Sequence, residues 1–145
     1  MVPSKRFKPV HRVAESRENK AARALGESQR KMREHTGRLE ELKQYHCEYL
    51  ERFSNASREG LSVPQMQEYR AFLMKLETAI RDQEKVLQTS RRECTGKKDA
   101  WQEKHIRTQA LGKAMDRFRK AENKVEVSRE QQATDEHNQW RNKDT

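Results

Sequence analysis

The sequence predicts an all-α protein, a long antiparallel two-helix coiled-coil hairpin whose second helix is longer than the first. Only 32% of its 145 residues are hydrophobic while 38% are charged, so there is too little apolar surface for one compact core. Gly (5) and Pro (3) are scarce, which favours long helices over disorder. The apolar residues recur on alternating three- and four-residue steps, the spacing of a narrow seam between two helices.

The first helix is predicted over residues 9–54, after a flexible basic arm at residues 1–8. Pro9 fits the first turn of a helix, where the N–H that proline lacks would be unsatisfied anyway. The weaker positions of the seven-residue repeat in this helix are occupied by polar residues. The apolar seam consists of Leu25, Met32, Leu39, Leu42, Tyr49 and Phe53, and the polar residues in it are Ser28, His35 and His46.

Residues 55–63 interrupt the pattern and are predicted to form the loop. Gly60 suits a left-handed or turn conformation. Ser62 is a plausible N-cap for the next helix, because Gln65 three residues later completes a capping box. Pro64 then falls in the first turn of that helix, where a proline is tolerated.

The second helix is predicted over residues 64–138, followed by a tail at residues 139–145. Its seam keeps a strict seven-residue repeat, which is apolar at both ends and polar from Gln83 to Lys104. The repeat runs through Met66, Tyr69, Leu73, Leu76, Ile80, Gln83, Leu87, Ser90, Cys94, Lys97, Trp101, Lys104, Thr108, Leu111, Met115, Phe118, Glu122 and Val125.

A short loop makes the two helices antiparallel neighbours, and two registers satisfy their pairing. One sets Leu39 opposite Leu76, and the other sets Leu42 opposite Ile80 with Tyr49 opposite Leu73; the repeat does not choose between them. In both registers the N-terminal end of the first helix lies near residues 105–113 of the second. The part of the second helix beyond these residues is therefore expected to overhang. That overhang keeps an apolar stripe, which points to an external partner. The stripe consists of Leu111, Met115, Phe118 and Val125.

The formal net charge of +9 is unevenly distributed along the chain. Residues 1–23 hold seven Lys and Arg and two Glu, a net of +5; residues 24–80 hold nine of each sign; and residues 81–145 hold sixteen basic and twelve acidic residues, a net of +4. Both ends of the chain are therefore basic. A basic end attracts acidic protein surfaces, anionic lipid or nucleic acid, and charge alone does not choose among them.

The sequence predicts no enzyme, no cofactor and no metal site. Cys47 and Cys94 read as free thiols in a reducing compartment, and no histidine pairs with another ligand at zinc-like spacing. No phosphate-binding loop or catalytic arrangement is present, and no apolar run approaches the ~20 residues of a membrane span. Residues 1–13 lack the apolar core of a signal peptide, so secretion is not expected. Nucleic acid is the main alternative to a protein partner, but mixed charge and the lack of a DNA-reading motif argue against it.

One group of residues beside the seam is a candidate docking stripe. Phe72 and Ala79 flank the seam beside Leu76 and Gln83, and the four residues share one helix face at i, i+4, i+7 and i+11. Phe72 either widens the seam near the loop or belongs to a half-exposed stripe that docks a partner. Periodicity alone leaves both interpretations open.

Several segments form a distinctive series in order along the hairpin. Near the start of the chain they are the run Ala-Ala-Arg-Ala-Leu-Gly-Glu at residues 21–27 and the residues Leu42, Tyr45 and Tyr49. The later ones are the block at residues 69–80 that contains Phe72, Leu76 and Ala79, the run at residues 101–110 that begins with Trp101, and the pair Asp135 and Glu136. Together, over about residues 19–141, these segments resemble the flagellar FliJ family.

This resemblance implies an antiparallel coiled coil similar to the rotor stalk of rotary ATPases. Such proteins insert into the hexameric flagellar export ATPase, promote its assembly, couple it to the membrane export gate protein and escort unladen export chaperones. The chain is then expected in the cytoplasm, peripherally associated with the inner membrane at the flagellar base. A generic coiled-coil scaffold or substrate chaperone without an ATPase partner is the alternative, and no nucleic acid partner is expected.

The resemblance also suggests which residues contact these partners. The gate-contacting stripe of the family maps onto Phe72, Leu76, Ala79 and Gln83, and Gln83 is the one departure from the family's pattern. The ATPase-facing end is expected where both termini lie, and here that end is basic. The residues expected to bind the ATPase ring are Lys5, Arg6, Lys8, Arg12, Arg17, Lys20 and Arg23, which we call the N-terminal basic set.

Overall fold

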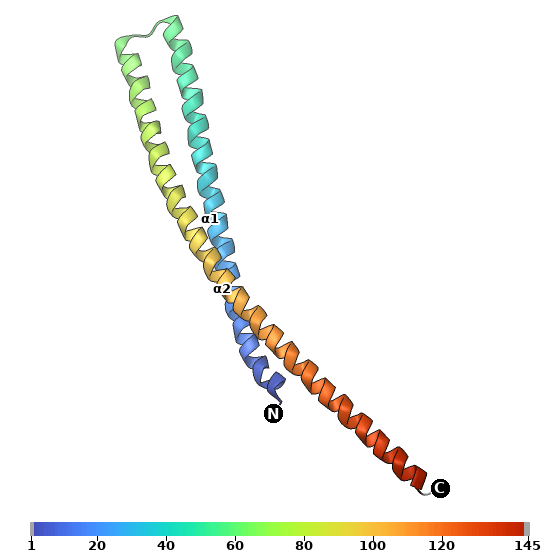
Figure 1. Ribbon diagram of the computed structural model, residues 1–145. Helices are drawn as coiled ribbons and strands as arrows, with labels where there is room; N and C mark the ends of the chain where they lie inside the picture. Colours follow the sequence, from blue (N-terminus) through green and yellow to red (C-terminus); the bar gives the residue numbers. More distant parts are fainter. Residues whose placement is uncertain (1, 144–145) are drawn as a thin grey trace. The chain divides into compact units, whose positions relative to one another are not determined.

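A computed structural model describes residues 2–143, and they form two helices joined by a short loop (Figure 1). Helix α1 spans Pro3–Glu59 with 57 residues, and helix α2 spans Val63–Lys143 with 81 residues. The described residues contain no strand. The predicted all-α helical hairpin with a longer second helix is therefore confirmed.

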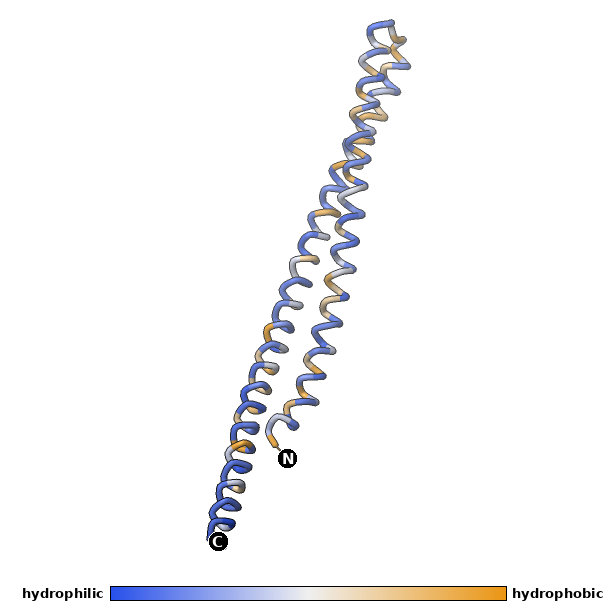
Figure 2. Tube along the Cα trace, turned by 90° about the vertical axis from the view of Figure 1, so that its right-hand side faces the viewer, coloured by the Kyte–Doolittle hydropathy of each residue, from blue (hydrophilic) through white to orange (hydrophobic). Residues whose placement is uncertain are grey.

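The chain divides into two compact units, each a pair of antiparallel helical segments. Unit 1 combines the chain up to Ala21 with the chain from Trp101 onward, and unit 2 is the continuous segment Ala22–Ala100. Apolar residues occur as isolated positions along both helices and never as a long run (Figure 2). Each unit is therefore held by a narrow line of contacts between two helices.

Unit 2 is built on a leucine seam. The side chains of Leu39, Leu73, Leu76 and Leu87 are 4–8% exposed, with Leu87 the most buried at 4%. On α2, Leu73, Leu76 and Leu87 occupy seam positions of the seven-residue repeat, so they face α1.

Contacts in unit 2 also decide the register. The rings of Tyr49 and Phe72 lie 4.4 Å apart, and the rings of Phe53 and Tyr69 lie 5.4 Å apart. These pairs match the register with Tyr49 opposite Leu73 and exclude the other, because a shift by one heptad would separate the rings.

The loop is shorter than residues 55–63, because α1 continues to Glu59. Residues 55–59 contain no glycine or proline, and Arg58 in the last turn complements the helix dipole. Gly60 takes a φ of 99°, the left-handed conformation that glycine adopts without strain. The predicted capping box is confirmed: the Gln65 N–H donates to Ser62 Oγ at 3.3 Å, and the Ser62 N–H donates to Gln65 Oε1 at 3.1 Å.

The predicted N-terminal arm is wrong for residues 3–8, which are helical. Pro3 occupies the first position of α1, so Pro9 lies inside the helix. The start is stabilised from α2: the Ser4 N–H donates to Glu122 Oε1 at 3.1 Å, and the Ser4 hydroxyl donates to Glu122 Oε2 at 2.6 Å. α1 has no acidic residue in its first turn, so Glu122 supplies the negative charge that a helix N-terminus favours.

The C-terminal boundary also differs from the prediction. Helix α2 continues to Lys143, so the part of the predicted tail at residues 139–143 is helical. Residues 144–145 of that tail, like residue 1 of the predicted arm, lie outside the described residues. Arg141 and Lys143 stand in the last turn, where positive charge stabilises a helix.

The longer α1 changes the predicted overhang. In unit 1, Met115 is 8% exposed and Ala14 is 6% exposed, and the rings of Phe7 and Phe118 stack at 5.3 Å. The overhang was expected to begin near residues 105–113, but α1 covers α2 as far as Glu122. Of the predicted apolar stripe, Val125 remains largely open at 52% exposure.

Candidate interaction surfaces

The four residues of the candidate docking stripe divide between core and surface. Leu76 and Gln83 are only 7% and 8% exposed, and Gln83 donates its Nε2–H to the carbonyl of His35 at 3.1 Å. Phe72 and Ala79 are half-buried. Two members thus hold α1 and α2 together within unit 2, so Phe72 and Ala79 are the ones that can also meet a partner.

Phe72 belongs to a loop-end aromatic cluster, formed by Tyr45, Tyr49, Phe53, Tyr69 and Phe72. Tyr49 packs on Phe72 at 4.4 Å, and Tyr45 meets Phe72 edge-on at 6.0 Å. All 3 tyrosines of the chain gather here, and no hydrogen bond of their hydroxyls occurs within the described residues. Such rings combine apolar area with a polar tip, which suits a protein interface.

Phe72 is the one member of the cluster among the candidate site residues, and Tyr45 is the most accessible of the four that they omitted. Its side chain is 42% exposed, more than any other member of the cluster. The signal was present, because Tyr45 and Tyr49 stand four residues apart and therefore share a helix face. What the spacing alone could not show is that both rings face Phe72, since that depends on the register.

A half-buried imidazole lies next to this cluster in unit 2. His46 Nε2 is buried without a hydrogen-bond partner in the structure, and it stands 3.5 Å from Glu77 Oε1. His46 lies on α1 and Glu77 on α2, so this contact joins the two helices. The pair therefore supports the helix pairing beside the aromatic cluster.

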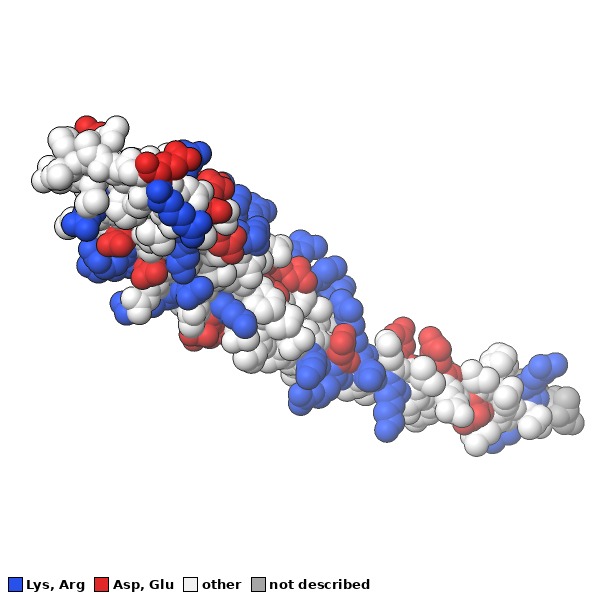
Figure 3. Space-filling model, turned by 90° about the horizontal axis from the view of Figure 1, so that it is seen from above, with Lys and Arg blue, Asp and Glu red and all other residues white. Residues whose placement is uncertain are grey.

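The N-terminal basic set lies on α1, with every member exposed. Lys and Arg side chains also project along the face seen in Figure 3. Among the described residues, the only Lys or Arg side chains in ion pairs are Arg30 and Lys43, both in unit 2. The cations of unit 1 are therefore available to an acidic partner. Arg23 is the one member of the set that lies in unit 2.

Three carboxylates of unit 1, those of Glu15, Glu18 and Glu122, have partners other than Lys and Arg. His105 Nδ1 and Glu18 Oε1 are hydrogen-bonded at 2.5 Å, and His11 Nδ1 lies 3.4 Å from Glu15. The hydrogen bond from His105 lowers the pKa of Glu18 and outweighs the burial that raises it. Trp101 stacks on His105 at 5.0 Å. We call Glu18, His105 and Trp101 the polar clasp of unit 1.

Comparison with known protein families identifies the chain. Residues 4–143 match the family described as Flagellar FliJ protein. The chain belongs to the FliJ family. No curated protein and no solved structure shows significant similarity to it. FliJ proteins are non-catalytic components of flagellar protein export, so this FliJ protein is a component of the flagellar export apparatus.

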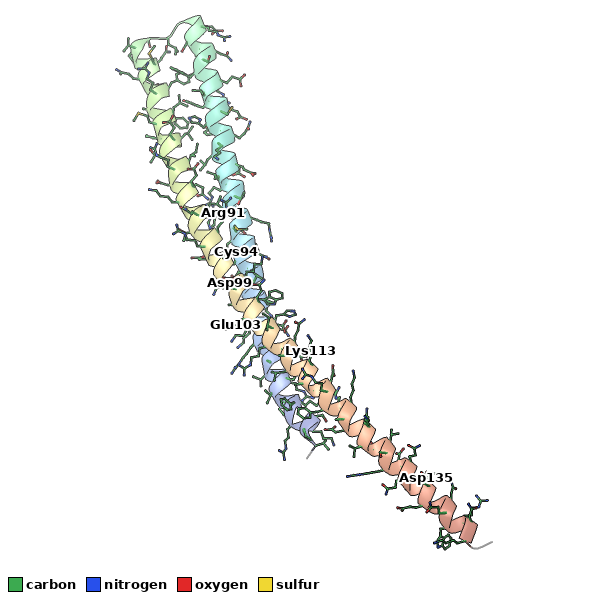
Figure 4. The ribbon with its side chains drawn as sticks, viewed as in Figure 1. Arg91, Cys94, Asp99, Glu103, Lys113 and Asp135 are labelled. Carbon is green, nitrogen blue, oxygen red and sulfur yellow. The ribbon has the colours of Figure 1, made fainter. Side chains whose placement is uncertain are left out.

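The other chemistry of this FliJ protein is simple. No group of three or more His, Cys, Asp or Glu that could hold a metal occurs within residues 2–143. The part of the chain that the structure describes has no helix apolar enough to cross a membrane. Cys47 is exposed and Cys94 is half-buried, both as free thiols, and Figure 4 shows Cys94 on α2.

Proposed function

We propose that this FliJ protein is the stalk-like component that joins the flagellar export ATPase to the membrane export gate. Unit 1 enters the hexameric ATPase ring and promotes its assembly, and the loop-end aromatic cluster of unit 2 contacts the gate. The same protein escorts unladen export chaperones. It acts in the cytoplasm, at the inner-membrane face of the flagellar base. The observation that carries the proposal is the family match over residues 4–143 of a two-helix chain.

The charge of unit 1 supports its role in the ring. By sequence, unit 1 holds sixteen Lys and Arg against ten Asp and Glu, a net of +6, whereas unit 2 holds sixteen against thirteen, a net of +3. Six of the seven members of the N-terminal basic set belong to unit 1. Exposed cations without internal partners steer a protein toward an acidic surface and set its orientation there.

The aromatic cluster supports the gate contact. Interface hot spots are enriched in tyrosine and other large side chains that are partly packed before the partner arrives. Phe72 is held by Tyr45 and Tyr49 at ring distances of 6.0 and 4.4 Å, so it meets a partner in a fixed orientation. Ala79 lies two turns further along the same face of α2 and leaves room for a side chain of the gate.

The test is co-purification of the full chain with the export ATPase and with the cytoplasmic domain of the gate. Changing Lys5, Arg6 and Lys8 to Glu should weaken ring association by on the order of tenfold at low salt and reduce its salt dependence. The matched control changes Arg33, Arg38 and Arg92 to Glu, three exposed cations of unit 2. Gate binding should survive both variants.

Three outcomes would count against the proposal or part of it. If the control variant lost ring association to the same extent, the net charge of the chain, and not the position of the cations in unit 1, would explain binding to the ring. Failure of the unmodified chain to capture the ATPase would favour the alternative, a generic coiled-coil scaffold or substrate chaperone without an ATPase partner. Capture of the ATPase with unchanged ATPase stimulation in the Lys5, Arg6 and Lys8 variant would remove the N-terminal basic set from the site.

A further inference from the structure

The outward face of α2 in unit 1 carries an unbroken row of cations between two exposed aliphatic side chains. In the seven-residue repeat, Met115 and Phe118 occupy the seam positions a and d, so positions c and f face away from α1. Between Glu103 and Gln131, which occupy the same positions at either end, the residues are Ile106, Ala110, Lys113, Arg117, Lys120, Lys124 and Val127, which we call the outward stripe.

Each member of the outward stripe is exposed. Ile106 and Val127, which end the stripe, are 65% and 60% exposed. Figure 4 shows the labelled Lys113 on the part of α2 that belongs to unit 1. Since the seam residue Met115 is 8% exposed, the stripe stays accessible while the two helices of unit 1 remain paired.

The stripe has no structural role that accounts for its charge. Lys113, Arg117, Lys120 and Lys124 follow one another at steps of four, three and four residues, so each is a neighbour of the next on the helix surface. Like charges at this spacing destabilise a helix. None of the four forms an ion pair within the described residues, and the nearest acidic residue on this side, Asp116, stands beside the row and not in it.

Unit 2 shows that the fold does not require such a row. The same c and f positions of α2 in unit 2 mix neutral, basic and acidic residues. A run of seven such positions, matched in length to the outward stripe, consists of Ala71, Lys75, Thr78, Asp82, Lys85, Thr89 and Arg92. Because Asp82 stands between Lys75 and Lys85, like charges there are separated. The uninterrupted row in unit 1 therefore indicates an anionic ligand that runs along α2.

We propose that the outward stripe lies on an anionic phospholipid surface. A straight row of cations on one helix face can reach lipid phosphates along its whole length, while Ile106 and Val127 enter the boundary between headgroups and acyl chains. An acidic protein surface would complement the four cations but would leave both aliphatic side chains against polar groups. A bilayer interface complements both features. This contact belongs to chains outside the ATPase ring, because the ring contact of the proposed function would enclose the same face of unit 1.

The expected effect follows from charge. Each Lys or Arg close to an anionic bilayer strengthens binding by roughly fivefold, and the attraction is screened by salt. Removing two cations from the stripe should therefore weaken vesicle binding by roughly 25-fold. Removing two cations elsewhere should weaken it less, because only the stripe lies in contact with the headgroups.

The experiment is co-sedimentation of the full chain with vesicles that mix phosphatidylglycerol and phosphatidylcholine, with pure phosphatidylcholine vesicles beside them. The test variant is Lys113→Ala with Lys120→Ala. One control is Lys75→Ala with Lys85→Ala at outward positions of unit 2, and another is Lys5→Ala with Lys8→Ala on α1 of unit 1. Circular dichroism checks that each variant stays helical. A separate Ile106→Ser variant should weaken binding at high salt, where the aliphatic contact contributes more of the affinity.

The results separate the explanations. Selective loss in the Lys113 and Lys120 variant, with binding only to anionic vesicles, supports the stripe. Equal loss in either control would overturn it, because net charge would then explain the binding. No binding of the unmodified chain to anionic vesicles would also overturn it. If the test variant kept vesicle binding but lost capture of the ATPase, the stripe would be a protein-binding surface and the lipid assignment would be wrong.

Discussion

Units 1 and 2 use the same two helices but are held together by different forces. In unit 2 the facing helices bury four leucines and pack five aromatic rings near the loop. In unit 1 the buried apolar side chains are Ala14 and Met115, and polar contacts carry much of the pairing. These are the bonds from Ser4 to Glu122 and the polar clasp of Glu18, His105 and Trp101.

The difference has a thermodynamic consequence. Burying a leucine stabilises a protein by about 1.5–3 kcal/mol and is nearly independent of pH and salt. A hydrogen bond to a charged group contributes about 1.5–3 kcal/mol at best, and it depends on the protonation of both partners. Unit 2 should therefore stay paired across conditions in which unit 1 opens. Such a division suits a protein whose basic unit rearranges on a partner while its aromatic unit stays formed.

The largest effect should come from the leucine seam. Leu76→Ala removes a side chain that is 7% exposed and should lower the free energy of unfolding by about 2–5 kcal/mol. Met74→Ala is the matched control on the same helix, because Met74 is 66% exposed and should change little. Urea unfolding followed by circular dichroism measures both. Equal effects would mean that unit 2 is not held by its seam.

A second change tests the aromatic cluster as a docking surface. Phe72→Ala should weaken gate binding by about 2 kcal/mol or more if Phe72 is a hot spot. It should also lower the unfolding midpoint, because Phe72 packs on Tyr49 at 4.4 Å. Leu73 and Ile80 are untouched, so the chain should remain helical. Thermal unfolding and gate affinity, measured on the same variant, separate the two effects.

The interpretation depends on which property changes. A variant that melts early but binds the gate normally below its midpoint would make Phe72 a core residue only. A loss of gate binding larger than the loss of stability supports the docking role. Met74→Ala serves again as the control, because Met74 lies on the same stretch of α2 but outside the cluster.

The sequence predicted the local features of the fold and missed those that depend on pairing. The loop glycine, the capping box of Ser62 and Gln65, and the long second helix all follow from residues close in the chain. The start of α1 at Pro3 could not be predicted, because Glu122, which caps it, lies 118 residues away. The clasp between Glu18 and His105 likewise required the register, which the repeat left open.

The candidate site was predictable in part for the same reason. Leu76 and Gln83 already belonged to the predicted seam, so the repeat itself indicated that they would be buried. Phe72 and Ala79 flank that seam, and the structure leaves them half-buried. The packing of Tyr45 on Phe72 joins residues of different helices, and only the fold reveals it.

A third prediction concerns the pH dependence of unit 1. The hydrogen bond from His105 lowers the pKa of Glu18 in the folded protein. A carboxyl group whose pKa is lower in the folded than in the unfolded protein stabilises the folded state. This stabilisation is fully present at pH values above the unfolded pKa of about 4.3, and it is lost as the pH falls through the lower pKa of the folded protein. The pairing of residues 4–18 with α2 should therefore weaken in acid by about 1 kcal/mol, before unit 2 changes.

Native-state hydrogen exchange at several pH values measures this effect segment by segment. Amides of residues 4–18 should lose protection first as the solution becomes acidic. Glu18→Gln should remove this part of the pH dependence and leave the protection of unit 2 unchanged. If the two units lost protection together at every pH, the polar clasp would not be what distinguishes unit 1.

The smallest effect tests the closeness of packing in each unit with one pair of glycines. Gly96 of unit 2 has open space where a Cβ would stand, whereas a Cβ on Gly112 of unit 1 would lie 3.4 Å from His11 Nε2. Alanine is favoured over glycine inside a helix by about 0.8–1 kcal/mol. Gly96→Ala should gain nearly all of this, because nothing opposes the added methyl group. Gly112→Ala should gain less, since the His11 ring must shift slightly and its contact with Glu15 at 3.4 Å shifts with it. Thermal unfolding of the two variants side by side measures the difference in stability. An equal gain at both positions would show that the His11 ring does not restrict a methyl group at position 112.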